Sequence, residues 1–383
     1  MWGASGFMRR TRALRASFVS LLLLASGLAT CPYPIVQSAE AWFTVFCGDH
    51  DAEFLCECVT SGLPYDFEDA DPGGESFSVP NYVSEEHASK VDDWVSAESS
   101  VGRYVKVPRS FVRGTSAIGV VDKDHSNFAK VRVVHDLSRP EGISTNDGIS
   151  YETSEFPRVK DAFAMLRPGY FQAKVDLQSA YRSFPVNPRH WRHQALEWGG
   201  QTYMDTSLPF GAASAPPGFN RFTQALVRYM RGRGFASTLG YLDDFWLCAP
   251  TEARCREGYD LLRRTLADLG FVVSEHKCVP PTTRLVFLGI ELDSGDAQGR
   301  CVMRLPDEKR VRALEACQLL APPGSGVPTR VSRSSLMFVS GYLSHCADVV
   351  FGSRLYLRAM HTASAAIGRR MYMVCVTYCP AGR

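Results

Sequence analysis

The sequence predicts an α+β fold in which helices cover one face of a sheet. From Val105 onward, short apolar runs are separated by turn residues, as is typical of strands. Apolar residues also recur at helical spacing in two longer segments, 219–230 and 259–269. With 383 residues, 45% hydrophobic and 21% charged, the chain is long enough for two or three domains, and this composition excludes wholesale disorder.

The elements expected after residue 100 come in a fixed order, and the chain beyond Arg310 is expected to be helical again. They are strands at 118–121 and 131–137 that form a hairpin, a strand at 171–177, a helix at 219–230 after the loop 211–218, two strands within 239–249, a helix at 259–269 closed by Gly270, and short strands at 271–274 and 285–292.

The first hundred residues lack this regular pattern. Residues 1–30 place four arginines before the apolar run 18–28, which is the layout of a secretory signal peptide; a buried helix or a spurious start of the reading frame are the alternatives. Residues 31–100 are acidic and rich in Ser, Gly and Pro. We expect them to be a poorly structured lead-in that carries no chemistry.

Charge is distributed in opposed blocks. The net charge is +2, but residues 41–100 hold 14 acidic residues against Lys90 alone, whereas residues 101–383 hold 37 basic residues against 25 acidic ones. A basic body of this size predicts an anionic polymer as partner. Residues 311–383 contain eight arginines and only two acidic residues, which favours a grip on a nucleic-acid backbone and leaves too few carboxylates for a metal-dependent nuclease.

The twelve cysteines are irregularly spaced and predict reduced, partly buried thiols. One cluster has the residue types of a zinc site, but its spacing matches neither a paired motif nor a finger, so the pattern disfavours zinc. This cluster consists of Cys47, His50, Cys56 and Cys58.

Three acidic residues interrupt apolar strands. Asp176 ends one strand, and Asp243 with Asp244 divides another apolar run. A carboxylate in such a strand is costly unless it is paired or binds a metal. If the strands are neighbours, the three acids form a site suited to magnesium and to in-line phosphoryl transfer. The alternative is a polar hairpin tip.

Five segments around these acids resemble the palm motifs of reverse transcriptases, and two flanking segments extend the resemblance to about residues 103–360. Residues 132–146 are similar to the fingers of retrotransposon enzymes. Residues 336–360 are similar to the link towards RNase H in tyrosine-recombinase elements of the DIRS and Ngaro type. The five palm-like segments are Asp176–Tyr181, Leu208–Phe219, Tyr241–Asp244, Leu269–Lys277 and Phe287–Gly289.

The resemblance implies a right-hand polymerase fold. Fingers and palm would occupy residues 101–310, and a basic helical thumb or connection would occupy residues 311–362, with residues 363–383 unassigned. Because no RNase H sequence follows, we expect a truncated element. Arg189, His190, Trp191, Arg192 and His193 either contact template phosphates or form an exposed loop.

The resemblance also implies a role for each matched residue. Asp176 and Asp243 would bind two Mg²⁺ ions, or Mn²⁺, with Asp244 as a weaker ligand, and Lys277 would act as a general acid. Tyr181 would select deoxynucleotides by clashing with a 2′-hydroxyl. The nucleotide-binding residues would be Lys123, Arg132, Ser179, Ala180, Tyr181, Phe210 and Gly211, and the primer grip would be Phe287, Leu288 and Gly289.

The function expected from these observations is that of an RNA-directed DNA polymerase. Its partners would be an RNA or DNA template with a primer and deoxynucleoside triphosphates, without stable membrane association. The cytoplasm or nucleus is favoured, against the signal-like start. One alternative is a non-catalytic retroelement fragment that binds nucleic acid. Another is an RNA-directed RNA polymerase, against which Tyr181 and the sequence Tyr241-Leu-Asp-Asp244 count.

Overall fold

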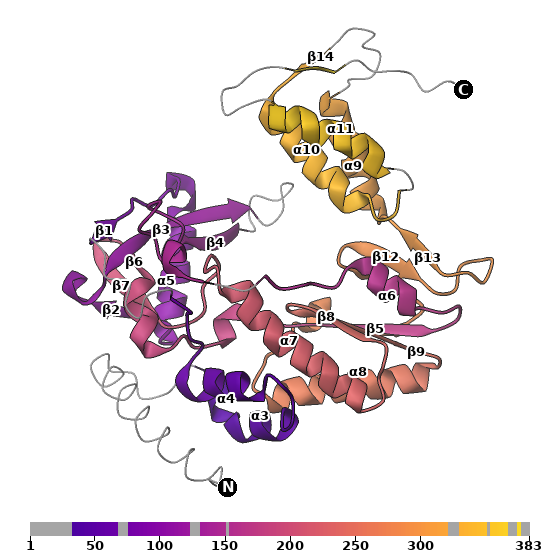
Figure 1. Ribbon diagram of the computed structural model, residues 1–383, viewed down its shortest axis with the longest axis horizontal. Helices are drawn as coiled ribbons and strands as arrows, with labels where there is room; N and C mark the ends of the chain where they lie inside the picture. The colour runs from indigo at the N-terminus through magenta and orange to yellow at the C-terminus, as the bar shows by residue number, and fades with distance from the viewer. Residues whose placement is uncertain are drawn as a thin grey trace. The chain divides into compact units, whose positions relative to one another are not determined.

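The computed structural model describes most of the chain (Figure 1). The chain divides into two compact units. The signal-like segment 1–30 and Lys123 lie outside the described residues, which are 33–67, 76–122, 131–150, 153–320, 329–350, 353–366 and 374–376. The first unit comprises Met1–Phe156, Val175–Phe245 and Glu257–Cys278, and the second comprises Pro157–Lys174, Trp246–Arg256 and Val279–Arg383.

A six-stranded mixed sheet lies in the first unit. Its main path runs β1-β3-β6-β7-β2, and β4 pairs antiparallel with β3, which confirms the hairpin predicted for residues 118–137. In that hairpin Arg132 lies opposite Val121. The strands are β1 (Phe77–Ser78), β2 (Tyr104–Val107), β3 (Gly114–Asp122), β4 (Val131–Asp136), β6 (Ala195–Trp198) and β7 (Gln201–Asp205).

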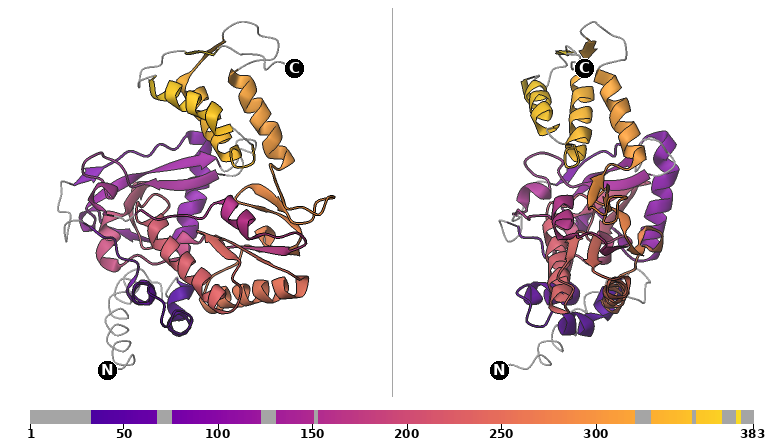
Figure 2. Two further views of the ribbon diagram at one scale, coloured as in Figure 1. Left: turned by 45° about the vertical axis from the view of Figure 1, so that its right-hand side comes forward. Right: turned by 90° about the vertical axis from the view of Figure 1, so that its right-hand side faces the viewer.

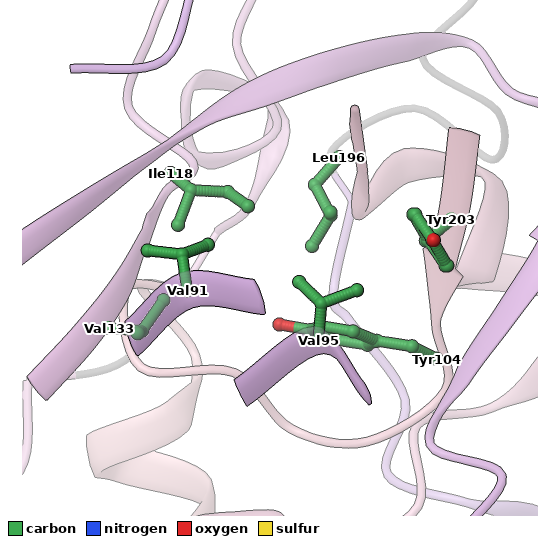
Figure 3. Packing of buried hydrophobic residues seen from close by; sticks show 7 residues of the cluster. All are labelled: Val91, Val95, Tyr104, Ile118, Val133, Leu196 and Tyr203. Carbon is green, nitrogen blue, oxygen red and sulfur yellow. The ribbon is translucent and has the colours of Figure 1, made fainter. Parts of the chain in front are cut away.

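Helix α5 packs one face against this sheet, as Figure 3 shows. Val91 and Val95 of α5 are buried against Ile118, Val133 and Leu196 of the strands. The helices of the first unit are α2 (Pro34–Gln37), α3 (Ala39–Val45), α4 (Ala52–Ser61), α5 (Glu85–Ser100) and α7 (Ala215–Gly232), with 3₁₀ turns η1 (Arg109–Phe111), η2 (Asn146–Gly148), η3 (Tyr181–Ser183), η4 (Pro188–His193) and η5 (Glu275–Lys277).

The expectation of a poorly structured lead-in at residues 31–100 is wrong for its described part. Trp42 on α3 is fully buried, and its indole Nε1 donates to the Leu269 carbonyl (2.9 Å). Its ring also packs against Phe184 and Phe222. Gly270 has a φ of +86°, and a Cβ there would lie 2.7 Å from the backbone of the lead-in. The scattered aromatics of this acidic segment therefore belong to the core of the first unit.

A four-stranded sheet of order β10-β5-β9-β8 contains Asp176 at the end of β5 and Asp244 at the start of β9. Strands β5 and β9 and helix α8 each continue from one unit into the other along the chain. The pair of strands predicted within 239–249 is confirmed. The elements are β5 (Phe171–Asp176), β8 (Thr238–Tyr241), β9 (Asp244–Ala249), β10 (Val279–Thr282) and α8 (Glu252–Asp268).

Two local predictions need correction. The loop expected up to Gly218 ends earlier, because α7 begins at Ala215; Pro216 and Pro217 fit the first helical turn, where a missing N–H costs little. The strand expected at 271–274 is only a bridge between Val273 and Leu177. The apolar face of α7 is buried as predicted, through Phe219, Phe222, Leu226 and Met230.

The second unit contains a small antiparallel sheet and a helical part. Helix α10 packs against α9 and α11, and the three lie side by side in both views of Figure 2. Leu336 and Val339 of α10 are buried against Ala316 and Leu320 of α9. The elements are α6 (Val159–Met165), β11 (Arg284–Phe287), β12 (Ile290–Asp293), β13 (Val302–Arg304), α9 (Asp307–Leu320), β14 (Thr329–Val331), α10 (Arg333–Cys346), α11 (Ser353–Ala366) and β15 (Val374–Val376).

The cysteines of the described segments are free thiols, as the sequence predicts. In the same segments, none of the helices combines the length and the apolar character needed to cross a bilayer.

Candidate active site

Neighbouring strands bring two of the predicted acidic residues close together. Asp176 ends β5, and Asp243 lies in the two-residue turn between β8 and β9. The Leu177 N–H donates to the Asp243 carbonyl (3.1 Å), which joins the end of β5 to this turn. Leu242, the first turn residue, has a φ of +52°, a strained value for leucine that two-residue hairpin turns require.

The carboxylates of this turn are partly withdrawn from water. The Asp176 side chain is only 5% exposed and accepts a hydrogen bond from Lys277 Nζ (3.0 Å). Burial raises the pKa of Asp243, and the charge of Asp176 raises that pKa further. The charges of Lys277 and Arg132 counter this effect only in part. The ionised form of Asp243 therefore carries an electrostatic cost that a bound cation would relieve.

The segment after α8 places Lys277. Backbone hydrogen bonds from Ser274 N to the Asp176 carbonyl (2.8 Å) and from Gln178 N to the Val272 carbonyl (2.9 Å) tie this segment to the end of β5. Partial burial lowers the pKa of Lys277, but the hydrogen bond to Asp176 and the nearby carboxylate charges outweigh it, so that this pKa is raised. Lys277 is therefore a cation at neutral pH.

Asp244 begins β9 and is half-buried. Its charge acts on Lys277, which places it in the same electrostatic neighbourhood. The carboxylate oxygens of Asp176, Asp243 and Asp244 do not all lie within 4.8 Å of one another in the described structure. In this structure the three carboxylates therefore do not form a closed three-ligand cage.

An aromatic cluster lies beside the acidic residues. The ring of Tyr181 packs against Phe210 (centroids 5.3 Å apart) and edge-on against Phe219 (5.4 Å). The guanidinium of Arg132 lies over the Phe210 ring, 5.2 Å from its centroid. Burial, with the charges of Asp243 and Tyr241, raises the pKa of Tyr181, so its hydroxyl stays neutral.

The loop that carries Phe210 is fixed by backbone contacts. His135 N donates to the Phe210 carbonyl (3.2 Å), and Asn146 Nδ2 donates to the Gly211 carbonyl (2.8 Å). Gly211 has a φ of +125°, and a Cβ at this position would lie 2.0 Å from the His135 carbonyl oxygen. Only glycine fits this approach of the loop to β4.

Ser179 and Ala180 lie between Asp176 and Tyr181. Ser179 is exposed and has a φ of +50°, whereas Ala180 is buried. Ser179 therefore has a strained backbone in an exposed turn just after Asp176, and strained residues of this kind often occur at functional sites.

A buried ion network behind Tyr181 was missed by sequence reasoning. Arg182 donates through Nε to Glu98 (3.0 Å) and through Nη1 to Asp205 (2.6 Å). Arg103 also donates to Glu98 (3.2 Å). Removing one partner of a buried pair costs about 3–5 kcal/mol. The sequence does contain one indication of this network. Arg182 lies in the mostly apolar segment 180–186, and a charged side chain that is buried there needs a partner of opposite charge.

The remaining predicted residues lie elsewhere. Phe287, Leu288 and Gly289 belong to the second unit, where Phe287 is buried and Leu288 and Gly289 form the β11–β12 turn with φ values of +47° and +76°. The segment 189–193 is not the exposed loop that was one alternative. His190, Trp191 and His193 are buried, whereas Arg189 and Arg192 are exposed.

The cysteine cluster also fails as a metal site. Within the described residues, the group with metal-ligand geometry is Asp49, His50 and Asp51, and it includes none of the cysteines. Its two aspartates are already paired, because Arg228 donates to Asp49 (2.7 Å) and to Asp51 (2.8 Å). The group therefore anchors α7 to the lead-in.

Comparisons with known proteins find similarity to the middle of the chain. Residues 143–292 match the family model "Reverse transcriptase (RNA-dependent DNA polymerase)". Protein P of duck hepatitis B virus (strain China) is 27% identical over 182 residues, which cover 47% of this chain and 23% of that protein. The Gag-Pol polyprotein of avian reticuloendotheliosis virus is 29% identical over 204 residues, covering 49% of this chain and 17% of the polyprotein. The chain thus matches less than a quarter of the length of these relatives.

Solved structures share the fold. The foamy viral protease-reverse transcriptase dRH in complex with double-stranded DNA aligns with a TM-score of 0.63 at 14% identity, over 87% of this chain and 56% of that chain. The foamy viral protease-reverse transcriptase in complex with an RNA/DNA hybrid aligns with a TM-score of 0.63 at 12% identity, over 88% and 44%. This likeness confirms the polymerase-type α+β fold expected from the sequence.

Proposed function

We propose that this protein is an RNA-directed DNA polymerase that joins deoxynucleotides to a primer 3′ end, because residues 143–292 match the reverse transcriptase family model. The observation that carries the proposal is the meeting of Asp176, Asp243 and Lys277 where β5 and the β8–β9 turn are hydrogen-bonded. The solved relatives are complexes with double-stranded DNA and with an RNA/DNA hybrid, which supports a primed template as partner.

The donor set of this site fits magnesium. Carboxylate oxygens are the ligands that Mg²⁺ prefers, and the raised pKa of Asp243 marks a position where a cation is favourable. Asp176 and Asp243 would hold two ions, Mg²⁺ or Mn²⁺, with Asp244 as the weaker ligand. When bound, the ions would supply activation of the primer hydroxyl and charge stabilisation at the leaving oxygen.

Side chains around the carboxylates would hold the nucleotide. Arg132 would bind triphosphate oxygens, together with Lys123. The backbone N–H groups of Ser179 and Ala180 would also face triphosphate oxygens, for which the exposed, positive-φ turn at Ser179 is suited. Stacking of the Arg132 guanidinium on Phe210 keeps this cation beside the loop that would support the new base pair.

Two residues would act directly on the incoming nucleotide and the product. Tyr181, wedged between Phe210 and Phe219, would stand beneath the sugar and exclude a 2′-hydroxyl. Lys277 would leave its hydrogen bond with Asp176 and donate a proton from Nζ to the departing pyrophosphate. Its charged state at neutral pH is what a proton donor needs.

The second unit would grip the primer and template. Phe287, Leu288 and Gly289 would form the primer grip at the β11–β12 turn, and helices α9 to α11 would serve as the thumb or connection. The arginine excess of residues 311–383 supports this role. The viral relatives support an origin in a retroelement, and the pattern of residues 336–360 supports one of the DIRS or Ngaro type.

Primer extension by the full chain tests the proposal. Wild-type protein with Mg²⁺ is expected to extend a DNA primer on an RNA template with deoxynucleotides, and Asp243→Asn is expected to abolish the extension. Failure of the wild type with both Mg²⁺ and Mn²⁺, on RNA and DNA templates, would favour a non-catalytic nucleic-acid-binding fragment. Preferential use of ribonucleotides would favour an RNA polymerase instead.

The proposed gate has its own test. Tyr181→Ala is expected to increase ribonucleotide incorporation relative to deoxynucleotide incorporation, because the aromatic barrier is removed. Unchanged selectivity would withdraw this role from Tyr181.

A further inference from the structure

We propose that Arg182 is a positioning residue for Tyr181, and that Glu98 of helix α5 keeps Arg182 in place and so takes part in sugar selection. The inference rests on the proposed polymerase function and on the gate role of Tyr181. It assigns a part in nucleotide selection to a helix that precedes all the polymerase-like motifs in the chain.

Arg182 is held from two directions by buried partners. Its side chain is 3% exposed, and those of Glu98 and Asp205 are 7% and 0% exposed. Both guanidinium edges are used, since Nε and Nη2 donate to Glu98 and Nη1 donates to Asp205. The guanidinium also lies over the ring of Tyr104, 5.4 Å from its centroid. Three elements, α5, β2 and β7, thereby fix one side chain of η3.

The carboxylate partners are themselves held in place. The second oxygen of Glu98 accepts from Arg103 Nη1 (3.2 Å), and the second oxygen of Asp205 accepts from the Ser207 N–H and hydroxyl (both 3.0 Å). Every oxygen of the two carboxylates has a hydrogen-bond donor, so the network holds the Arg182 side chain in a single conformation.

Tyr181 and Arg182 are consecutive residues of the same 3₁₀ turn, and their side chains have different neighbours. The Tyr181 ring contacts Phe210 and Phe219, whereas the Arg182 guanidinium lies among the buried ions and Tyr104. A displacement of Arg182 can therefore reach Tyr181 through the η3 backbone that the two residues share. The arginine acts on the ring through the η3 backbone, without touching it.

The acidic residues are fixed by other contacts. Hydrogen bonds of Leu177 with Asp243 and of Ser274 with Asp176 hold the strand end independently of Arg182. Loosening the ion network should consequently disturb the gate more than the carboxylates. Selectivity between sugars is the property that should change most.

The experiment compares Glu98→Gln and Arg182→Lys with Val91→Ala in the full chain. Glu98→Gln keeps the side-chain shape but removes the charge that holds Arg182, and Arg182→Lys keeps a charge but cannot bridge both carboxylates. Val91 lies on the same helix, fully buried against the sheet, so Val91→Ala is a matched control that destabilises α5 without touching the network. The measurement is the ratio of deoxynucleotide to ribonucleotide incorporation efficiency, at a temperature where all variants are folded.

We expect both network variants to reduce this ratio by roughly tenfold, as loss of steric fit in a pocket does, and Val91→Ala to leave it unchanged. A second readout is the ¹⁹F resonance of a fluorotyrosine placed at position 181, which should shift or broaden in Glu98→Gln and not in Val91→Ala. An unmoved resonance with an unchanged ratio would overturn the inference. A wild type without polymerase activity whose resonance still responds to Glu98→Gln would refute the proposed function and keep the positioning contact.

Discussion

Two clusters in the first unit each contain aspartates close to basic side chains, but the pKa of an aspartate is lowered in one cluster and raised in the other. Asp49 and Asp51 lie against the arginines of α7, and the hydrogen bond from Arg228 lowers the pKa of Asp49. Asp176 and Asp243 lie against Lys277, yet burial and the charge of Asp176 raise the pKa of Asp243. In the first cluster, arginine side chains stabilise the ionised carboxylates. In the second cluster, the ionised form of Asp243 is destabilised by burial and by the charge of Asp176.

This contrast shows which cluster is built for a ligand. By the spacing of ligand atoms alone, Asp49, His50 and Asp51 make the better metal site, since their donor atoms all lie within 4.8 Å of one another. Their negative charge is already met by two arginines, so a divalent ion would have to displace Arg228. At Asp243 a cation would instead relieve an existing electrostatic penalty. Charge balance, rather than proximity, separates an anchoring cluster from a candidate catalytic one.

The largest expected difference between the clusters is in catalysis. Asp176→Asn should lower the rate of single-nucleotide incorporation by about 10³-fold or more, because it removes a proposed metal ligand. Asp49→Asn, which makes the same chemical change in the other cluster, should leave the rate within about threefold of wild type at a permissive temperature. Rapid-quench measurement of one incorporation step checks both values. Equal losses in the two variants would break the distinction.

The next effect concerns Lys277, the lysine of the candidate catalytic cluster. Lys277→Gln should slow incorporation by about 10²-fold, since a positioned general acid contributes about 10²–10⁴-fold. The pH dependence of the rate should lose its alkaline limb in this variant, because that limb reports deprotonation of Lys277. Lys106→Gln, an exposed lysine on β2, serves as the control and should match wild type. A retained alkaline limb in Lys277→Gln would assign the proton to another donor.

Stability should respond in opposite directions in metal-free buffer at pH 7. Asp243→Asn should raise the free energy of unfolding by about 1 kcal/mol, because it removes a charge whose pKa is raised by burial. Asp49→Asn should lower it by about 1 kcal/mol, because its pKa is lowered by Arg228 and the partly exposed pair is worth little more. Urea unfolding with a chelator present measures both changes. Changes of the same sign would contradict the electrostatic contrast.

The smallest effect at pH 7 comes from His135, whose contribution to stability changes in the acid range. Burial lowers the pKa of His135 from 6.5 to about 4, so the unfolded chain binds this proton first as the pH falls. Neutral His135 therefore contributes fully to the free energy of unfolding above about pH 6.5. This contribution is lost as the pH falls from about 6.5 to 4, by about 3 kcal/mol in total. His135→Gln should remove this slope from a plot of unfolding free energy against pH. The two clusters are best compared above pH 6.5, where His135 does not titrate.

The strands and the long helices of the palm could be predicted because their signals are local. Short apolar runs joined by a polar loop located β3 and β4, and the spacing of Phe219, Phe222 and Leu226 located α7. The interruption of apolar strands by Asp176 and Asp243 located the candidate site, since a buried carboxylate is unfavourable unless it is paired or binds a metal.

The lead-in could not be predicted because its order depends on distant partners. Trp42 is ordered by Leu269 and the surrounding aromatic rings, and Glu98 is ordered by Arg182, 84 residues along the chain. An acidic, serine-rich composition gives no indication of such contacts. For the same reason the sequence could not show that His190 and Trp191 are buried.

Manganese binding by the full chain, followed by electron paramagnetic resonance, tests the central claim most directly. Wild-type protein is expected to bind Mn²⁺ without substrate, and Asp243→Asn is expected to weaken this binding by about tenfold or more. The double variant Asp49→Asn/Asp51→Asn is expected to bind like wild type. Loss of binding in the double variant, with binding retained in Asp243→Asn, would contradict the account and move the metal site to the lead-in.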